Sequence, residues 1–246
     1  PGRAVTVSPA EVELKAPKTT FEVAVLDGTT ETAVERQGHG FQRTILISAL
    51  QLLAQSGSAS ADGVICLAIE EPELFQHPIQ AQAFAKVLRS LVEDPDKCIQ
   101  VTYATHSPYF LEARHFDQVR RLTRSSGETP TVAIHFASVD DVKTRLHQIV
   151  NADVVERQLD GIVSDQLAVA LFAHRAFLVE GTTESSVFHG IGDKMSLGAL
   201  EAAGISIVPV GGKTSIPLVH AILSALGIPV YALFDADRAC AARAKA

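Results

Sequence analysis

Cysteine is scarce in this sequence of 246 residues, and long apolar runs are absent. Cys66, Cys98 and Cys240 lie far apart and form no CxxC pair, which argues against a disulfide framework or a zinc site and favours reduced thiols in a cytoplasmic protein. No apolar run reaches about 18 residues, and the first residues lack the basic-then-apolar pattern of a secretion signal. We therefore expect no segment that spans a membrane.

Basic charge is also in short supply, with 21 Lys and Arg residues against 28 Asp and Glu residues and a net charge of −7. This balance argues against a uniformly basic coat for nucleic acid, although it allows a local basic groove. Hydrophobic residues make up 47% of the chain, which is ample material for buried cores. The chain begins at Pro1 instead of Met, which predicts that it is a fragment of a longer protein.

Apolar periodicity predicts a mixed α/β fold. Alternation in "VTVSPAEVEL" and "FEVAVLDG" favours short antiparallel strands. Residues Gly40 to Gly57 have helical spacing, with Phe41, Ile45, Leu46, Ala49, Leu52 and Leu53 on one face. Two continuous apolar runs, "GVICLAIE" and "CIQVTYA", predict buried strands. The helix between them is expected to begin after Pro78 and to bury Ile79, Phe84, Val87, Leu88 and Leu91.

The second half of the chain is predicted to contain a parallel sheet. "VRRLTR" and "TVAIHF" are short strand candidates, and helices are expected over 139–150 and 154–173. Beyond them, "FLVEG", "ISIVPVGG" and "PVYALFDAD" are strands that alternate with helices, which implies right-handed crossovers and a parallel sheet. We predict two domains, residues 1–173 and residues 174–246.

The apolar strand in "VICLAIEEPE" ends in two adjacent carboxylates, Glu70 and Glu71. This is the layout of a Walker B element, in which the first acid lies near magnesium and the second polarises an attacking water. The alternative is an exposed strand end, where Glu-Glu-Pro favours the start of a helix. Upstream, "ERQGHGFQR" places a Gly-x-Gly turn at a helix start that suits a phosphate, and downstream "CIQVTYATHSP" carries a strand to His106.

In this order the three motifs resemble the C-terminal lobe of ABC-type ATPases of the SMC/RecF/OLD group. The resemblance implies that Glu70 binds magnesium, that Glu71 is the catalytic glutamate and that His106 is a switch near the γ-phosphate. It also implies that the glycines of the first motif reach the nucleotide of a second subunit. The implied nucleotide-binding residues are Gly38, Gly40, Gln42, Glu70 and His106.

The phosphate-binding loop of such an ATPase is missing. No GxxxxGK[ST] segment precedes Glu70. The nearest match, "VGGKTS", has Ile207 in place of the first glycine and follows the Walker B element instead of preceding it. We therefore expect the chain by itself to bind ATP poorly or not at all, and the loop to lie N-terminal to Pro1.

A second set of acids lies in "AFLVEGTTESSVFHG" and "VYALFDADR". Glu180 ends one apolar run that predicts a buried strand, and Asp235 and Asp237 end another, with both aspartates expected on the same side. Clustered carboxylates repel one another unless a cation holds them, and open α/β sheets bind ligands at these strand ends. Oxygen ligands without nearby Cys or His select Mg²⁺ or Mn²⁺. Glu184 belongs either to this set or to a helix start capped by Thr182.

Glutamate after the first strand, Gly-Gly after the second and Asp-x-Asp after the third resemble the Toprim pattern. An ABC signature, a Walker B element and a histidine switch followed directly by Toprim are similar to the OLD (overcoming lysogenisation defect) family of nucleases, from about Val23 to Arg238. That resemblance implies an α/β chain with an ATPase C-terminal lobe that dimerises, followed by a parallel-sheet Toprim domain that cuts DNA with divalent metal.

The resemblance also implies the roles of individual residues. Glu180 and Glu184 would hold one metal ion, and Asp235 and Asp237 a second. The catalytic residues would be Glu180, Asp235, Asp237 and the ATPase residue Glu71. Glu180 acting as a general base remains an alternative. The chain ends at Ala246, before the late basic residue that the family normally has, so we expect a C-terminally incomplete Toprim domain.

The leading hypothesis is a Mg²⁺- or Mn²⁺-dependent DNA endonuclease regulated by ATP, with a homodimer as the full assembly. One alternative is a Toprim topoisomerase or primase, although none of the tyrosines lies in a context suited to a nucleophile. Another is an ATP-gated DNA-binding or defence-complex subunit with a degenerate Toprim site. The basic stretch Arg120, Arg121 and Arg124 is expected either to touch DNA or to form a solvated strand edge.

Overall fold

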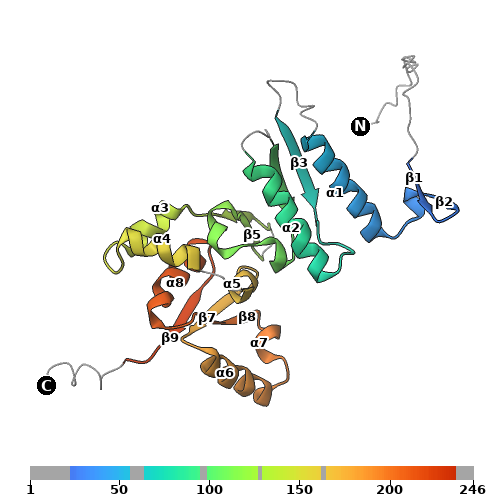
Figure 1. The fold of residues 1–246 in the computed structure, drawn as a ribbon. Coiled ribbons are helices and arrows are strands. Elements are labelled where there is room, and N and C mark those ends of the chain that lie inside the picture. The colour runs from blue at the N-terminus through green and yellow to red at the C-terminus, as the bar shows by residue number, and fades with distance from the viewer. Residues whose placement is uncertain (1–22, 56–63, 95–98, 127–128, 162–164, 237–246) are drawn as a thin grey trace, which may run out of the picture. The chain divides into compact units, whose positions relative to one another are not determined.

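The computed structural model of this chain describes residues 23–55, 64–94, 99–126, 129–161 and 165–236 (Figure 1). The predicted strand "VTVSPAEVEL" and the predicted ligand Asp237 lie outside these residues. The chain divides into two compact units, Pro1–Leu53 and Ala54–Ala246, and each is described by itself. Within the described residues, no helix has both the length and the apolar character that crossing a membrane requires.

The first unit contains a hairpin and a long helix. Its elements are β1 (Ala24–Asp27), β2 (Thr30–Ala33), the 3₁₀ helix η1 (Val34–Arg36) and α1 (His39–Gln55). The two strands pair antiparallel around Gly28, whose φ of +61° suits the turn. The predicted helix is confirmed, but its apolar face is not buried, since Phe41, Leu46 and Leu52 are exposed. In the described part of this unit, a two-stranded hairpin and the short helix η1 are the only elements that accompany α1.

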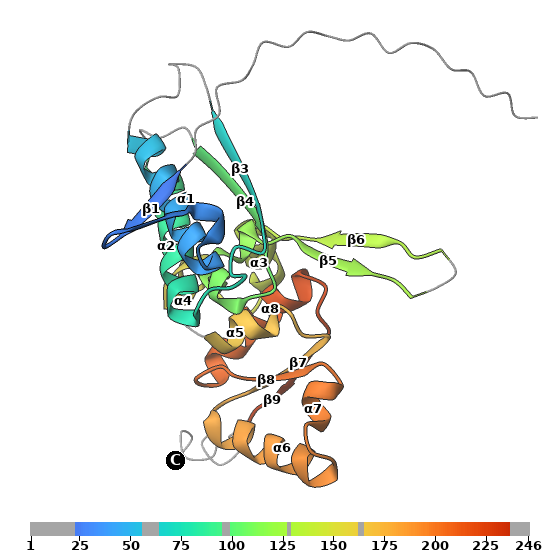
Figure 2. The same ribbon diagram turned by 90° about the vertical axis from the view of Figure 1, so that its right-hand side faces the viewer.

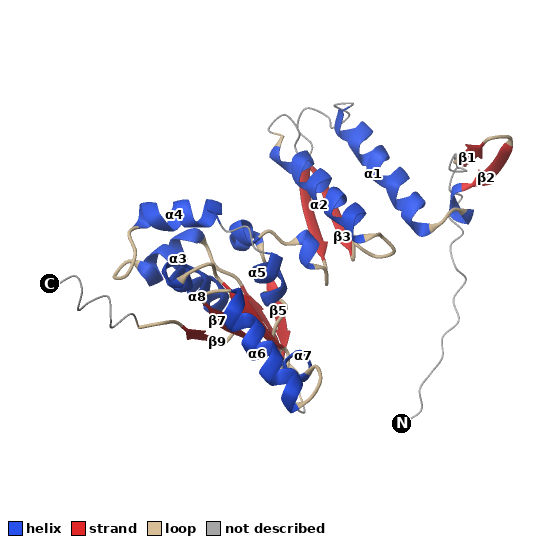
Figure 3. Cartoon of the chain, turned by 60° about the horizontal axis from the view of Figure 1, so that its bottom comes forward, coloured by secondary structure: helices blue, strands red, loops and turns tan. Residues whose placement is uncertain are grey.

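The second unit begins with a parallel strand pair. Its first elements are β3 (Ile65–Glu70), α2 (Pro78–Glu93), β4 (Ile99–Ala104) and the 3₁₀ helices η2 (Pro108–Phe110) and η3 (Ala113–Gln118). Parallel neighbours require a crossover, and α2 supplies it by running along the pair (Figure 3). The strands are not fully buried as predicted, because half-buried and exposed residues alternate along β3. Alternation of this kind follows when one face of a strand pair is covered.

The buried face of α2 differs from the prediction at two residues, Ile79 and Val87, and Val87 is half-buried. Its buried residues are Ala81, Phe84, Leu88 and Leu91. Ile79, which was expected to be buried, is 71% exposed. Ile79 lies two residues before Ala81. At about 100° per residue, its side chain points about 200° around the helix from that of Ala81. Apolar character alone therefore placed Ile79 wrongly, and its angular position on the helix explains why.

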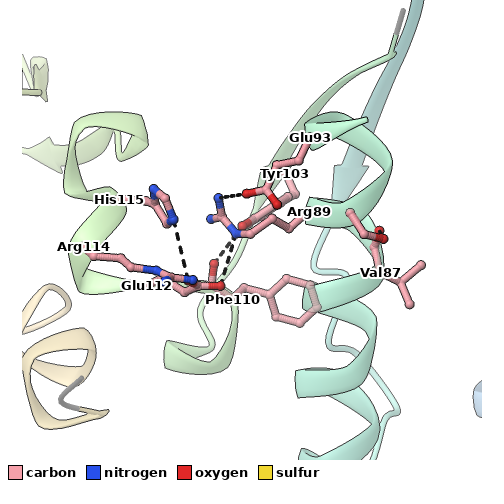
Figure 4. A network of polar contacts seen from close by, with 9 residues as sticks. Val87, Arg89, Glu93, Tyr103, Phe110, Glu112, Arg114 and His115 are labelled. Carbon is pink, nitrogen blue, oxygen red and sulfur yellow. Dashed lines mark hydrogen bonds and ion pairs between the residues drawn. The ribbon is translucent and has the colours of Figure 1, made fainter. Parts of the chain in front are cut away.

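A polar network fixes the segment that follows β4 (Figure 4). Its centre is Glu112, whose carboxylate accepts hydrogen bonds from Arg89 Nε on α2 at 3.1 Å and from Arg114 Nε at 2.9 Å. The Tyr103 hydroxyl donates to the Phe110 carbonyl at 2.7 Å. Burial by itself would raise the pKa of Glu112, but the hydrogen bond from Arg114 and the charges of both arginines outweigh it and lower that pKa below its ordinary value of 4.5.

We expect Glu112→Gln to lower the free energy of unfolding at neutral pH, because it removes the charge that binds both arginines. The loss should be only about 1 kcal/mol, because solvent screens this partly exposed network. A carboxylate with a lowered pKa contributes stability above its unfolded pKa and loses it as pH falls through the folded value. The difference between wild type and variant should therefore shrink below about pH 4.5 in calorimetric unfolding. Glu93→Gln, at a more exposed partner of Arg89, is the matched control. A difference that stays constant with pH would contradict the assignment.

A hairpin made of β5 (Arg121–Arg124) and β6 (Val132–His135) follows (Figure 2). Arg121 was expected at a solvated edge or on DNA, and this expectation is wrong. Its guanidinium donates to the carbonyls of Ala173 at 3.1 Å and Gly227 at 3.3 Å, and burial lowers the pKa of Arg121. These contacts hold the base of the hairpin against the turn that leads into the last strand.

We expect Gly227→Ala to destabilise this unit by roughly 2–4 kcal/mol. Gly227 has a φ of +73°, and a Cβ there would lie 2.5 Å from His135 Nδ1. The imidazole cannot turn away cheaply because its Nε2 bonds the Thr123 hydroxyl at 2.9 Å. Gly198→Ala is the control: its φ is +71°, but nothing lies closer than 4.0 Å, so only about 1 kcal/mol is expected. Equal losses of melting temperature in the two variants would contradict the clash.

Three helices connect the hairpin to the last sheet: α3 (Val139–Leu146), α4 (Ala152–Gly161) and α5 (Asp165–Ala170). A capping box between Ser138 and Asp141 begins α3. A single helix is predicted over 154–173; the described residues there form α4 up to Gly161 and α5 from Asp165 to Ala170, and residues 162–164 of the prediction lie outside the described residues.

The predicted parallel sheet of the C-terminal region is confirmed. Its strands are β7 (Arg175–Val179), β8 (Ile205–Pro209) and β9 (Val230–Leu233), in the order β8-β7-β9. The connecting helices are α6 (Thr182–Met195), α7 (Ala199–Ala202), η4 (Lys213–Ser215) and α8 (Ile216–Ala225). Helices α6 and α7 lie on one side of the sheet, and α5 and α8 on the other (Figures 1 and 2).

Burial in this sheet is uneven. Leu178 on the central strand β7 and Val208 on β8 are fully buried in the same core cluster as Leu223 of α8. The prediction of a buried β9 is wrong, since Tyr231 and Leu233 are exposed. In the described sheet β8 and β9 are both edge strands with one neighbour, but of these two only β8 carries buried residues, Ile207 and Val208.

Candidate functional site

The end of β7 is tied to the glycine turn that follows β8. The Val210 N–H donates to the Val179 carbonyl at 3.0 Å, and the Gly212 N–H donates to the Glu180 carbonyl at 2.9 Å. Gly211 and Gly212 have φ values of +76° and +129°, which side chains rarely adopt. The "VPVGGK" segment therefore forms a fixed turn beside the first predicted metal ligand.

The structure brings the ends of β7 and β9 together. The Asp235 N–H donates to Glu180 Oε1 at 2.6 Å, across 55 positions of sequence. The parallel register pairs Val179 with Leu233, so the strands β7 and β9 both end at the same edge of the sheet. The Glu180 side chain thus faces the segment that carries the second predicted pair of ligands. Asp235 itself is exposed.

Glu184 lies in the first turn of α6 and has a structural partner. Its Oε2 accepts the Gly181 N–H at 3.0 Å, so the carboxylate caps the helix start. Thr182 is therefore not the cap as predicted; Gly181 occupies that position, and Glu184 supplies the side-chain oxygen. The helix start holds Glu184 beside Glu180, and the capping bond leaves the other carboxylate oxygen for a further partner.

An open depression of about 600 Å³ lies over these residues. It is lined by Gln166, Glu180, Gly181, Thr182, Glu184, Pro209, Gly211 and Gly212. Gln166 on α5 was missed from the sequence, and no spacing rule links it to acids that follow it in the chain. Lys213, which was weighed as a phosphate contact, is exposed and is not among the lining residues.

The lining suits a hard cation. Two carboxylates and the glycine turn supply oxygen atoms, which Mg²⁺ and Mn²⁺ prefer, so these residues fit such an ion. Among the described residues, however, no three His, Cys, Asp or Glu side chains gather as a metal site. Asp237, the fourth predicted ligand, lies outside the described residues. The described acids are thus part of the predicted set.

A second acidic region lies at the ends of β3 and β4. Glu70 is the last residue of β3 and is exposed. The Glu71 N–H donates to the Ala104 carbonyl at 2.8 Å, and Glu71 Oε1 lies 3.8 Å from His106 Nε2. Glu71 has a φ of +44°, which costs a non-glycine residue free energy and often marks a functional position. The structure therefore brings together the predicted catalytic glutamate and the predicted switch.

Sequence reasoning missed the role of Glu73 in this region. Its Oε2 accepts the Thr105 hydroxyl at 2.8 Å, and its Oε1 accepts the His106 N–H at 2.8 Å. The only signal for it was the last letter of "EEPE", a pattern that by itself assigns no partner. Glu73 thus connects the turn after β3 to the end of β4.

The glycines of the first motif lie at the start of α1, in the first unit. The Gly38 carbonyl accepts the N–H groups of Phe41 and Gln42 at 2.9 and 3.1 Å, which begins the helix close to Gly40. The Gln42 side chain donates to the Gln37 carbonyl at 2.8 Å. Its amide therefore stabilises the turn before the helix, a role that the sequence did not indicate.

The fold and these two acidic regions define the class of protein: a mixed α/β chain with an ATPase domain followed by a Toprim domain. Residues 7–111 match the family model of the AAA ATPase domain. Residues 171–237 match the model described as "Overcoming lysogenization defect protein-like, TOPRIM domain".

Two characterised relatives carry the comparison further. The chain is 30% identical to the Old nuclease of Escherichia phage P2 over 208 aligned residues. The alignment covers 83% of this chain and 33% of that protein. The chain is 29% identical to the OLD nuclease of Thermus scotoductus over 200 aligned residues. This alignment covers 81% of this chain and 35% of that protein. The chain spans about a third of the length of these relatives. The resemblance to the OLD family that the motifs predict is confirmed.

Proposed function

We propose that this chain belongs to a metal-dependent DNA endonuclease that an ABC-type ATPase regulates. The observation that carries the proposal is the hydrogen bond from the Asp235 N–H to Glu180 Oε1, which joins two acidic strand ends beside an open depression. Both relatives bear the name nuclease, and the Toprim match covers the same residues. DNA would be the substrate, and a homodimer formed through the ATPase domain the assembly.

In this proposal, Glu180 and Glu184 hold one divalent ion, and Asp235 and Asp237 hold the other. Bound Mg²⁺ or Mn²⁺ would supply an activated water and stabilise the leaving oxygen of a phosphodiester. The chain itself positions the ligands: the Asp235 N–H holds one oxygen of Glu180, and the Gly181 N–H holds one oxygen of Glu184. General-base action by Glu180 is compatible with the same position.

The N-terminal region would supply the ATPase. Glu70 would hold magnesium, Glu71 would orient the attacking water and His106 would lie beside it. The first motif, at Gly38, Gly40 and Gln42, would reach nucleotide in the dimer, with ATP held by a phosphate-binding loop elsewhere in the protein. We propose domains over residues 1–173 and 174–246, and the separated cysteines favour a cytoplasmic protein.

Supercoiled plasmid incubated with the full-length protein and Mg²⁺ or Mn²⁺ tests the proposal. We expect nicked and linear DNA with metal, none with a chelator, and none from Asp235→Ala. Asp160→Asn, which removes an exposed carboxylate on α4, is the matched control and should cut like wild type. Relaxed plasmid without nicks would indicate a topoisomerase instead, and binding without any change in the DNA would indicate a subunit with a degenerate site.

A further inference from the structure

The turn after β3 has a fixed shape. The Leu74 N–H donates to the Glu71 carbonyl at 3.0 Å, and the Gln76 N–H donates to the Glu73 carbonyl at 3.0 Å. The Gln76 side chain adds a bond to the carbonyl of the buried Pro72 at 3.1 Å. These bonds hold the "EEPE" segment so that Glu73 is directed toward the end of β4.

Glu73 fastens three consecutive residues of the switch loop. Its two oxygens accept the Thr105 hydroxyl and the His106 N–H, each at 2.8 Å. The Thr105 hydroxyl in turn accepts the Ser107 N–H at 3.0 Å. Hydrogen bonds to an ionised carboxylate are about twice as strong as neutral ones, so Glu73 is a strong anchor for the loop at Thr105 and His106.

The loop conformation decides where the His106 imidazole lies. With its N–H held by Glu73, His106 places Nε2 3.8 Å from Glu71 Oε1. Glu71 is held from the other side by its own N–H on the Ala104 carbonyl. The Glu73 bonds therefore hold the backbone of the switch histidine at the position where its imidazole meets Glu71.

We infer that Glu73 is a positioning residue for ATP hydrolysis, which holds the His106 switch against the catalytic Glu71. The inference rests on the proposed ATPase function of Glu71. Glu73 does not touch the reacting groups in this scheme, since its oxygens are engaged by Thr105 and His106. Its effect is exerted on the turnover step through the geometry of its neighbours and not on nucleotide affinity.

The test compares Glu73→Ala and Glu73→Gln in the full-length protein. Glu73→Ala should lower kcat for ATP hydrolysis about 10- to 100-fold while KM stays within about twofold. Hydrogen exchange followed by mass spectrometry should show the His106 amide exchanging at least about tenfold faster. Glu73→Gln keeps one strong acceptor for two donors and should fall between wild type and alanine in both measurements. Asp160→Asn should change neither.

Each outcome decides a separate question. If Glu71→Gln hydrolyses ATP like wild type, the proposed ATPase function fails, whatever Glu73 does. If Glu71→Gln is inactive but Glu73→Ala keeps wild-type kcat, the inference about Glu73 fails alone, even where amide exchange accelerates, because the bonds would then be merely structural. If the alanine variant does not fold, the glutamine variant decides: unchanged kcat and exchange overturn the inference.

Discussion

Replacing Glu180 by Gln is expected to abolish metal-dependent DNA cleavage while leaving the fold intact. The substitution keeps the size of the side chain and one carbonyl oxygen, which still accepts the Asp235 N–H. It removes the charge that would hold a divalent ion. Loss of a residue that hydrogen-bonds a metal ligand typically lowers metal affinity or activity by about 10- to 100-fold. Loss of a ligand itself should therefore lower the cleavage rate by more than about 100-fold.

The measurement is the initial rate of plasmid nicking with Mn²⁺, paired with thermal unfolding of each variant. Glu201→Gln provides the matched control, because Glu201 is an exposed carboxylate on α7 that is not among the residues lining the depression. Its Oε1 lies 3.6 Å from His189 Nδ1. It should cut at the wild-type rate. Nicking by Glu180→Gln within about threefold of wild type, with both proteins folded, would remove Glu180 from the proposed metal site.

Replacing Glu71 by Gln should abolish ATP hydrolysis by the full-length protein and leave ATP binding nearly unchanged. Glu71 has a φ of +44°, and its Oε1 lies 3.8 Å from His106 Nε2. Strained backbone conformations of this kind cluster at active sites. A positioned general base typically contributes 10²- to 10⁴-fold to a reaction, so a loss of at least about 100-fold in kcat is expected.

Steady-state phosphate release at saturating ATP measures this effect. Glu93→Gln serves as the control, because Glu93 is an exposed carboxylate at the end of α2, outside the Glu71–His106 pair. A Glu71→Gln protein that turns over normally while Glu70→Gln does not would move the catalytic assignment from the second glutamate to the first.

The acids at the ends of β7 and β9 could be predicted because chemistry restricts where carboxylates are tolerated. Apolar strands that end in acids make sense when the acids share a cation, and parallel strands deliver their carboxyl ends to one edge. The bond between Glu180 and Asp235 spans 55 positions, yet strand order and charge were enough to place these residues near each other. The sequence pattern was therefore most informative where few arrangements are physically allowed.

Residues whose partners are chosen by packing could not be predicted. Glu73 and the His106 N–H are 33 positions apart, and Arg121 and Gly227 are 106 apart. Neither pair leaves a local pattern, because a glutamate or arginine suits many exposed positions equally well. Exposure of β9 was missed for a related reason: an apolar run indicates strand character, but the elements that cover each strand are a property of the assembled fold.

The central claim is that Glu180 and the segment after β9 form one divalent-metal site. Diffraction data collected at the manganese absorption edge, from crystals of the full-length protein grown with Mn²⁺, test it most directly. The account predicts anomalous density in contact with the Glu180 carboxylate and with the aspartates after β9, and none in Glu180→Gln crystals. Ordered acids with no manganese between them at saturating Mn²⁺, or manganese bound only elsewhere, would contradict it.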